Sequence, residues 1–297
     1  MSAEVDEPPV DTEPALLLVR PTYSNLFRDL SLSDAVEMSI EGTLALKRDR
    51  EGFTYGETSL ASVLSVMKRI DLAAHYPGGA QFVDLGSGIG NVVVGVALLS
   101  AAGALSGRIS AITGVELLQP LHAAAERAVS AMISRAPSSS APSLPLPLPP
   151  CSVICADIAD FDMLHEMDVV YMASTVFENS VMTRFTERAA EVLRPNSRVI
   201  TLHEPLKHDA FVTEAMVACA NSWGDEQAFI NVKRAASAID LRRDDFFGGG
   251  TDALQLGEGL ANPANGVRSL VAYHRASDGR TEWRLVETDA LQPSKRT

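Results

Sequence analysis

The sequence is poor in basic residues for its length. Lys and Arg together number 25 against 38 Asp and Glu, so the 297-residue chain has a formal net charge of −13. Phosphate binding relies on clustered Lys and Arg, so strong direct binding to nucleic acid is not expected. The main basic clusters, Lys47–Arg50 and Arg242–Arg243, both adjoin acidic residues and are expected to be solvated faces.

Cysteines and long apolar runs are also scarce. Cys151, Cys155 and Cys219 form an odd set without metal-ligand spacing, so neither a disulfide framework nor a metal site is expected. The acidic, proline-rich N-terminus lacks the apolar segment of a secretory signal, and no apolar run reaches the roughly 20 residues that span a bilayer. The sequence therefore predicts a soluble intracellular protein with no membrane contact.

Apolar segments alternate with amphipathic ones along most of the chain, which predicts an α/β protein with a mostly parallel sheet and helices on both faces. Strands are expected over 81–85, 109–116, 152–156, 167–173, 198–203, 228–233, 269–274 and 282–286. Helices are expected over 58–70, 92–99, 121–135, 181–193 and 209–220. Thr58 or Ser59 is placed to cap the first of these helices.

The expected organisation is a single α/β domain with extensions at each end. Residues 1–20 are predicted to be a disordered acidic tail, 21–75 an N-terminal helical cap, 76–290 the domain, and 291–297 a second tail. Irregular insertions are expected at 136–150, which is nearly all Pro, Ser and Leu, and at the Asp/Gly-rich stretch 243–266.

A glycine-rich loop follows the strand over 81–85. Gly86, Gly88 and Gly90 let the backbone turn tightly and let a ligand approach main-chain N–H groups. The glycines alone would also suit a nicotinamide enzyme. Asp84 decides against a pyrophosphate, because a carboxylate there repels phosphate and attracts a cofactor that carries a sulfonium and an ammonium.

Two further acids follow the next strands, and parallel sheets bind ligands at this edge. Glu116 ends the second strand, where its carboxylate can accept both hydroxyls of a ribose, and Asp157 with Ile158 follows the third, suited to an adenine. Glu116 alone would also fit NAD, so the pair of Asp84 and Glu116 carries the prediction. The cofactor predicted is S-adenosylmethionine.

Two motifs together resemble the disruptor-of-telomeric-silencing family of histone-lysine methyltransferases, which use a class I, Rossmann-like fold rather than the SET fold. The motifs are Tyr55-Gly56-Glu57-Thr58-Ser59 and Phe82-Val83-Asp84-Leu85-Gly86-Ser87-Gly88-Ile89-Gly90-Asn91-Val92-Val93. The resemblance implies that Tyr55, Glu57 and Thr58 fold over the cofactor as a lid. It also implies that Thr58, Asp84, Gly86 and Gly88 contact the methionine part of the cofactor. Asn91 stands where the family usually has a Gln that also contacts the cofactor.

The segment after the fourth strand departs from the family. Members commonly carry Asn-Asn-Phe there, whereas this chain has Ala173-Ser174-Thr175-Val176-Phe177, so only Ser174 or Thr175 can supply a polar group. The candidate catalytic residues are therefore Ser174, Thr175, Tyr171 and Phe177. Trp223 and Tyr273 are further candidates for an aromatic channel, and His203 and Glu204 for substrate or proton binding.

The resemblance implies a chromatin regulator in the nucleus that methylates a lysine of histone H3. The family's lysine-rich DNA-binding segment is absent, so contact with a nucleosome is expected only through a partner. Three alternatives remain: a methyltransferase acting on a non-histone protein or on a small molecule, a catalytically weak cofactor-binding scaffold, and a cytoplasmic location.

Overall fold

The computed structural model describes residues 13–46, 55–134, 143–235, 255–261, 268–275 and 281–287. The chain divides into two compact units, Met1–Ala235 and Ala236–Thr297. The division differs from the expected single domain over 76–290, because an apolar strand pattern does not say which sheet a strand joins. The predicted insertion at 136–150 contains no helix or strand over 143–150, and its remaining residues lie outside the described ranges.

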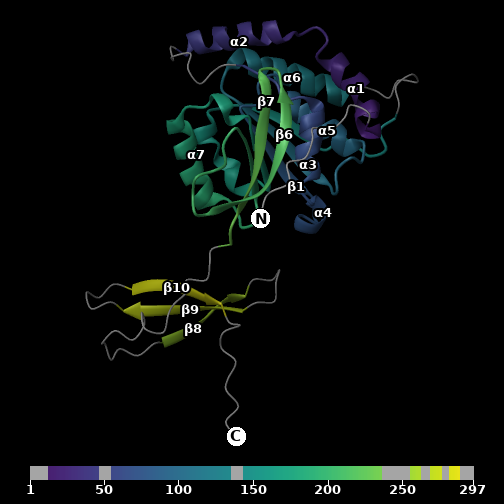
Figure 1. Ribbon diagram of the computed structural model, residues 1–297. Helices are drawn as coiled ribbons and strands as arrows, with labels where there is room; N and C mark the ends of the chain where they lie inside the picture. Colours follow the sequence, from purple (N-terminus) through teal and green to yellow (C-terminus); the bar gives the residue numbers. More distant parts are fainter. Residues whose placement is uncertain are drawn as a thin grey trace. The chain divides into compact units, whose positions relative to one another are not determined.

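The first unit contains helices, short 3-10 helices (η) and seven strands (Figure 1). In chain order they are α1 Pro14–Leu26, α2 Leu32–Ala45, α3 Leu60–Lys68, α4 Leu72–His75, β1 Ala80–Leu85, α5 Asn91–Ala101, β2 Ile109–Glu116, α6 Gln119–Ser134, β3 Cys151–Cys155, η1 Ile158–Asp160, η2 Asp162–Glu166, β4 Val169–Met172, η3 Ser174–Val176, α7 Asn179–Val192, β5 Arg198–Leu202, β6 Phe211–Asn221 and β7 Gly224–Lys233.

The seven strands form one sheet in the order β3-β2-β1-β4-β5-β7-β6. Strands β1 to β5 pair in parallel, and β7 runs antiparallel to both β5 and β6. One face packs against α1, α3, α5 and α6, and the other against η1, η2 and α7. The predicted mostly parallel sheet with helices on both faces is confirmed.

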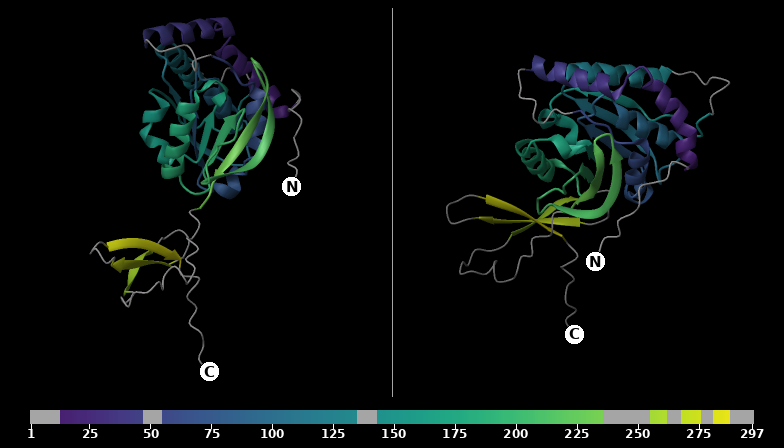
Figure 2. Two further views of the ribbon diagram at one scale, coloured as in Figure 1. Left: turned by 60° about the vertical axis from the view of Figure 1, so that its left-hand side comes forward. Right: turned by 45° about the horizontal axis from the view of Figure 1, so that its top comes forward.

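The N-terminal helices cover one side of the sheet, and α2 lies along α6 in both views of Figure 2. Helix α1 begins at Pro14, inside the stretch predicted to be disordered up to residue 20. The reason is packing: Leu16 and Val19 are fully buried beside α5, which outweighs the proline-rich composition. Helix α3 begins after Ser59, whose side chain caps it as predicted by accepting from the Ser62 N–H.

The helix predicted over 209–220 is wrong, because this segment is strand β6. Its Ala, Glu and Met residues favour a helix locally, but Val217 and Cys219 alternate into the core while the chain pairs with β7. Long-range pairing overrides local propensity here.

The second unit is a three-stranded antiparallel sheet in the order β10-β9-β8. Its strands are β8 Gln255–Ala261, β9 Arg268–Arg275 and β10 Thr281–Glu287. Strand β8 lies within the stretch 243–266 that was predicted to be irregular, because its glycines and alanine give little strand signal.

Candidate cofactor and acceptor site

A cavity of about 770 Å³ opens at the carboxyl edge of the parallel strands. The register places Asp84 beside Gly114 of β2 and Tyr171 of β4, so residues at neighbouring strand ends lie side by side. All ten residues predicted to bind the cofactor line this cavity: Tyr55, Glu57, Thr58, Asp84, Gly86, Gly88, Asn91, Glu116, Asp157 and Ile158.

The glycine loop turns back across the end of β2. The Gly86 and Ser87 N–H groups donate to the Val115 carbonyl at 2.8 and 3.0 Å. Gly86 and Gly88 have φ angles of 81° and 55°, in the left-handed region. A Cβ on Gly86 would lie 2.8 Å from Phe177 Cζ, and one on Gly88 would lie 2.6 Å from Tyr55 Cε2. Both positions therefore need glycine for conformation and for space.

Glu116 is fixed by backbone hydrogen bonds to both of its oxygens. Its Oε2 accepts the Gly88 N–H at 2.9 Å, and its Oε1 accepts the Leu118 N–H at 2.8 Å. Burial raises the pKa of Glu116, and the backbone N–H groups of Leu118, Gly88 and Leu117 oppose that rise. The carboxyl is thus held rigidly, and its remaining lone pairs are available to ligand hydroxyls.

Asp84 lies next to Glu116 and is only 2% exposed. Burial, together with the nearby Glu116, raises the pKa of Asp84 to about 8. The ion pairs within the described residues include neither carboxyl. Two buried acids that interact with each other, and that form no ion pair within the described residues, fit a positively charged ligand and disfavour a phosphate-bearing one.

The lid, defined as Tyr55–Ser59, is attached to the tip of the β6–β7 hairpin. The Ser59 N–H donates to the Ala220 carbonyl at 3.1 Å, and the Ser222 N–H donates to the Glu57 carbonyl at 2.8 Å. The Glu57 N–H in turn donates to Ser222 Oγ at 2.9 Å. A bridge between Thr58 and Asn221 lies between these bonds. The lid therefore extends the β6 edge as a short strand segment.

Side chains of the lid connect it to the cavity wall. The Tyr171 hydroxyl donates to Thr58 Oγ1 at 2.9 Å, and the Tyr55 hydroxyl donates to Glu57 Oε1 at 3.0 Å. Asn91 Nδ2 donates to the Tyr55 hydroxyl at 3.4 Å. Asn91 Oδ1 is buried and has no hydrogen-bond partner within the described residues, so it is available to a ligand.

The predicted catalytic residues divide into two groups. Tyr171, Thr175 and Phe177 line the cavity. Ser174 does not, which corrects the prediction: its hydroxyl donates to the Leu202 carbonyl at 2.8 Å and accepts the Leu202 N–H at 3.1 Å. Ser174 thus ties η3 to β5.

The four further candidates also separate. Trp223 lines the cavity, above Gly56 of the lid. His203 and Glu204 do not line it, because the His203 ring lies 3.3 Å from the Glu226 carboxylate and Glu204 pairs with Lys207 outside the cavity. Tyr273 belongs to β9 of the second unit, whose side chains lie outside the described part of the chain.

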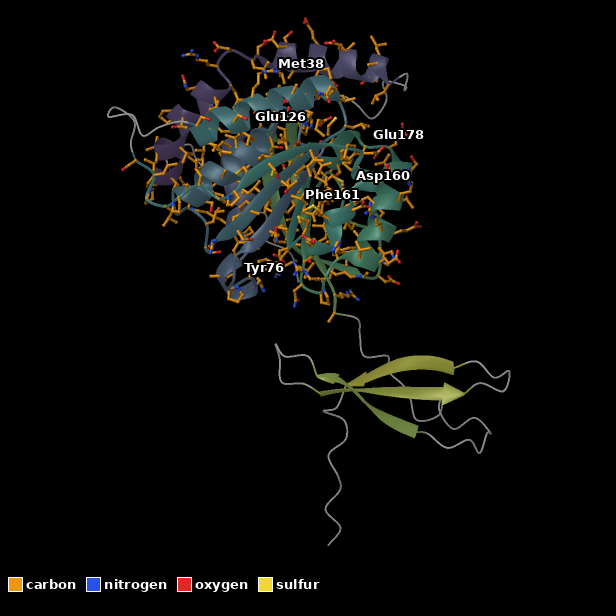
Figure 3. All side chains as sticks on the ribbon, turned by 180° about the vertical axis from the view of Figure 1, so that it is seen from behind. Met38, Tyr76, Glu126, Asp160, Phe161 and Glu178 are labelled. Carbon is orange, nitrogen blue, oxygen red and sulfur yellow. The ribbon has the colours of Figure 1, made fainter. Side chains whose placement is uncertain are left out.

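Residues at the start of α7 were missed by the sequence analysis. Glu178, Ser180, Val181 and Arg184 all line the cavity. Figure 3 labels Glu178 at one end of the first unit and Tyr76 at the other. The available signal was positional: α7 follows the loop after β4, so its first turns lie at the carboxyl edge of the sheet.

A family model described as "Histone methylation protein DOT1" matches residues 47–237, which is well over half of the chain. The chain belongs to the DOT1 family. The match ends close to Ala235, where the first unit ends. No curated protein matches the chain.

Solved structures of other methyltransferases resemble the DOT1-family chain distantly. An RNA methyltransferase from Salinibacter ruber in complex with S-adenosyl-L-homocysteine is 20% identical over 58% of this chain and 92% of its own, with a TM-score of 0.39. The magnesium protoporphyrin IX methyltransferase of Synechocystis PCC 6803 with bound SAM is 13% identical over 69% and 99%, with a TM-score of 0.44.

The DOT1-family chain has the class I methyltransferase fold, and its cofactor is S-adenosylmethionine. The cavity fits that cofactor, because the buried acids complement its cationic methionine part and Asn91 Oδ1 is an acceptor with no partner among the described residues. Asp84 and Asn91 would hold the methionine part, Glu116 the ribose, and Asp157 with Ile158 the adenine. In the described part of the DOT1-family chain, no helix combines the length and hydrophobicity that crossing a bilayer requires.

Proposed function

We propose that this chain methylates a lysine side chain of a protein, with histone H3 as the substrate and the nucleus as the site of action. The observation that carries the proposal is the charge of the cavity lining. Carboxyl groups come from Glu57, Asp84, Glu116, Asp157 and Glu178, whereas Arg184 is the only Lys or Arg among the described lining residues. Three of the acids lie at strand ends that suit the cofactor, and Glu57 belongs to the lid, which leaves Glu178 to attract a cationic acceptor.

The bound cofactor supplies a methyl group on a sulfonium, which is electrophilic without further activation. The chain has two tasks, to exclude water and to align the amine. Tyr55 and Phe177 pack on the glycine loop, and Trp223 packs on the lid, so three rings surround the site. An apolar surround disfavours the ammonium form and lowers the pKa of the incoming amine. Glu178, which is exposed, attracts the protonated side chain from solvent.

The test is transfer of a labelled methyl group to free histones, to nucleosomes and to a mixture of non-histone proteins, with mass-spectrometric identification of the modified residue. We expect label on a lysine of H3. The net charge of −13 disfavours nucleosomal DNA, so free histones are expected to be the better acceptor unless a partner protein is added. Label confined to non-histone proteins would contradict the histone proposal.

A second candidate, a methyltransferase for a non-histone protein or a small molecule, is favoured by the segment after β4. The family commonly has an amide there, whereas this chain places Ala173 and Thr175 in the cavity wall. Cofactor binding with no transfer to any acceptor would instead indicate a catalytically weak scaffold.

A further inference from the structure

The order of the strands arranges the cavity along one line. Strands β3, β2, β1 and β4 are successive neighbours, so their carboxyl ends lie in a row. Asp157 follows β3, Glu116 ends β2 and Asp84 belongs to β1, which suits adenine, ribose and the methionine part in the order in which they are joined. Strand β4 lies beyond β1, so the residues that follow it lie past the sulfonium end. An acceptor must approach from that side.

Thr175 follows β4 and has a polar atom that the fold does not use. Its Oγ1 is buried, and it has no hydrogen-bond partner among the residues that the structure describes. The residue also lines the cavity. Buried hydroxyls are normally paired, so an unpaired one in a cavity wall is explained by a ligand that pairs with it.

The adjacent residue, Ser174, also carries a hydroxyl, and its hydrogen bonds differ from those of Thr175. Ser174 Oγ both donates to and accepts from the Leu202 backbone, so its hydrogen-bonding capacity is taken up by β5. Of the two hydroxyls in this segment, the structure leaves only that of Thr175 available. Phe177, two residues further along the chain, has a ring that packs on Gly86 of the glycine loop, and both Thr175 and Phe177 line the cavity.

We propose that Thr175 Oγ1 binds the nitrogen of an amine acceptor. The inference rests on the proposed function, because it assumes the methionine part of the cofactor beside Asp84. A threonine hydroxyl accepts an N–H of the amine and holds the nitrogen, while the nitrogen lone pair stays directed at the cofactor. Its role is to bind and orient the substrate.

The test compares two ligands by calorimetry on the full chain. S-adenosylhomocysteine lacks a group at the acceptor side, whereas sinefungin carries a primary amine where the sulfonium methyl would be. Thr175→Val removes the hydroxyl at nearly constant shape, and Thr175→Ser retains it. We expect Thr175→Val to weaken sinefungin binding about tenfold. Binding of S-adenosylhomocysteine should change less than about twofold, and Thr175→Ser should bind both ligands like the wild type.

Ser174→Ala is the matched control, because it removes a neighbouring hydroxyl that belongs to the fold. We expect it to lower the melting temperature and to leave the ratio of the two affinities unchanged. Equal weakening of both ligands by Thr175→Val would place the hydroxyl on the cofactor and overturn the proposal. An unchanged ratio with unchanged affinities would overturn it as well.

The outcomes also separate this inference from the proposed function. A wild-type chain that binds neither ligand would contradict the cofactor assignment, and the Thr175 proposal would fall with it. If Thr175→Val weakens sinefungin binding selectively but the wild-type chain labels no histone, only the histone proposal is contradicted. In that case the acceptor is an amine on another molecule.

Discussion

At the scale of single residues, Asp84 lowers the stability of the ligand-free protein and favours its ligand. Its carboxyl is buried beside Glu116, and burial is the larger cause of its raised pKa. Residues with strongly shifted pKa values beside a cavity are characteristic of functional sites, where a ligand supplies the missing interaction. Here a positive charge on the ligand would replace the proton.

The stability of the ligand-free protein should therefore fall as the pH rises, because of the titration of Asp84. The folded pKa of about 8 lies above the usual 3.8, so the folded state holds a proton that the unfolded state releases between these values. Between these two pKa values, the contribution of Asp84 to the free energy of unfolding decreases by up to about 1.4 kcal/mol per pH unit. Thermal unfolding from pH 4 to 8 should show Asp84→Asn gaining stability relative to the wild type as pH rises.

Asp84→Asn should also weaken S-adenosylmethionine binding, and the affinity of this variant should no longer rise as the pH approaches 8. Asp209→Asn, which removes an exposed carboxyl outside the cavity, is the control and should change neither property. Equal pH profiles for Asp84→Asn and the wild type would show that the carboxyl is ionised without a ligand.

Gly56 gives a second prediction at this scale. A Cβ there would lie 2.2 Å from Trp223 Cε3, so Gly56→Ala must displace the ring or the lid. We expect the affinity for S-adenosylhomocysteine to fall about tenfold, measured by calorimetry. Gly78→Ala is the matched control, because no heavy atom of the described residues, apart from those of its chain neighbours, lies within 4 Å of its added Cβ. Similar affinities for the two variants would show that the lid does not cover the ligand.

At the scale of elements, the sequence allowed correct prediction of the segments whose burial is local and continuous. The strands β1, β4 and β5 are short, almost continuously buried runs between turns, and α5 is apolar and buried on all sides. Strand β6 was not predictable in this way, because its conformation depends on β7. The same holds for Ser174 and Thr175: the two hydroxyls are equivalent in sequence, and only the carbonyl of Leu202 distinguishes them.

The attachment of the lid to the β6–β7 hairpin yields an element-scale prediction. Ser222→Ala removes the acceptor of the Glu57 N–H but keeps the bond from the Ser222 N–H to the Glu57 carbonyl. We expect faster hydrogen exchange at Gly56–Ser59 and an affinity for S-adenosylhomocysteine weaker by about fivefold, because an exposed hydrogen bond contributes modestly.

Thr183→Ala is the control for this change, since it removes an exposed hydroxyl on α7 that bonds only to the Asn179 carbonyl within the described residues. It should leave exchange in the lid unaltered. If Ser222→Ala also leaves exchange in the lid unaltered, then the backbone bonds alone hold the lid and the side chain is dispensable.

At the scale of the whole molecule, every described residue that lines the cavity belongs to the first unit. Its lining residues run from Ser39 to Trp223, and the family match ends near the same boundary as the unit. A chain of residues 1–235 should therefore bind S-adenosylhomocysteine as the full chain does, within about twofold by calorimetry. A large loss of affinity, with an unchanged circular dichroism spectrum, would show that the second unit contributes to the site.

The contact between Trp223 and the lid has a practical consequence. The chain has two tryptophans, and the other, Trp283, lies in β10 of the second unit. With Trp283 replaced by Phe, all indole emission comes from a ring that lines the cavity and touches Gly56. A ligand that fills the cavity changes the polarity around that ring, so tryptophan fluorescence reports on binding. Occupancy of the cavity becomes measurable in real time, without a label and without turnover.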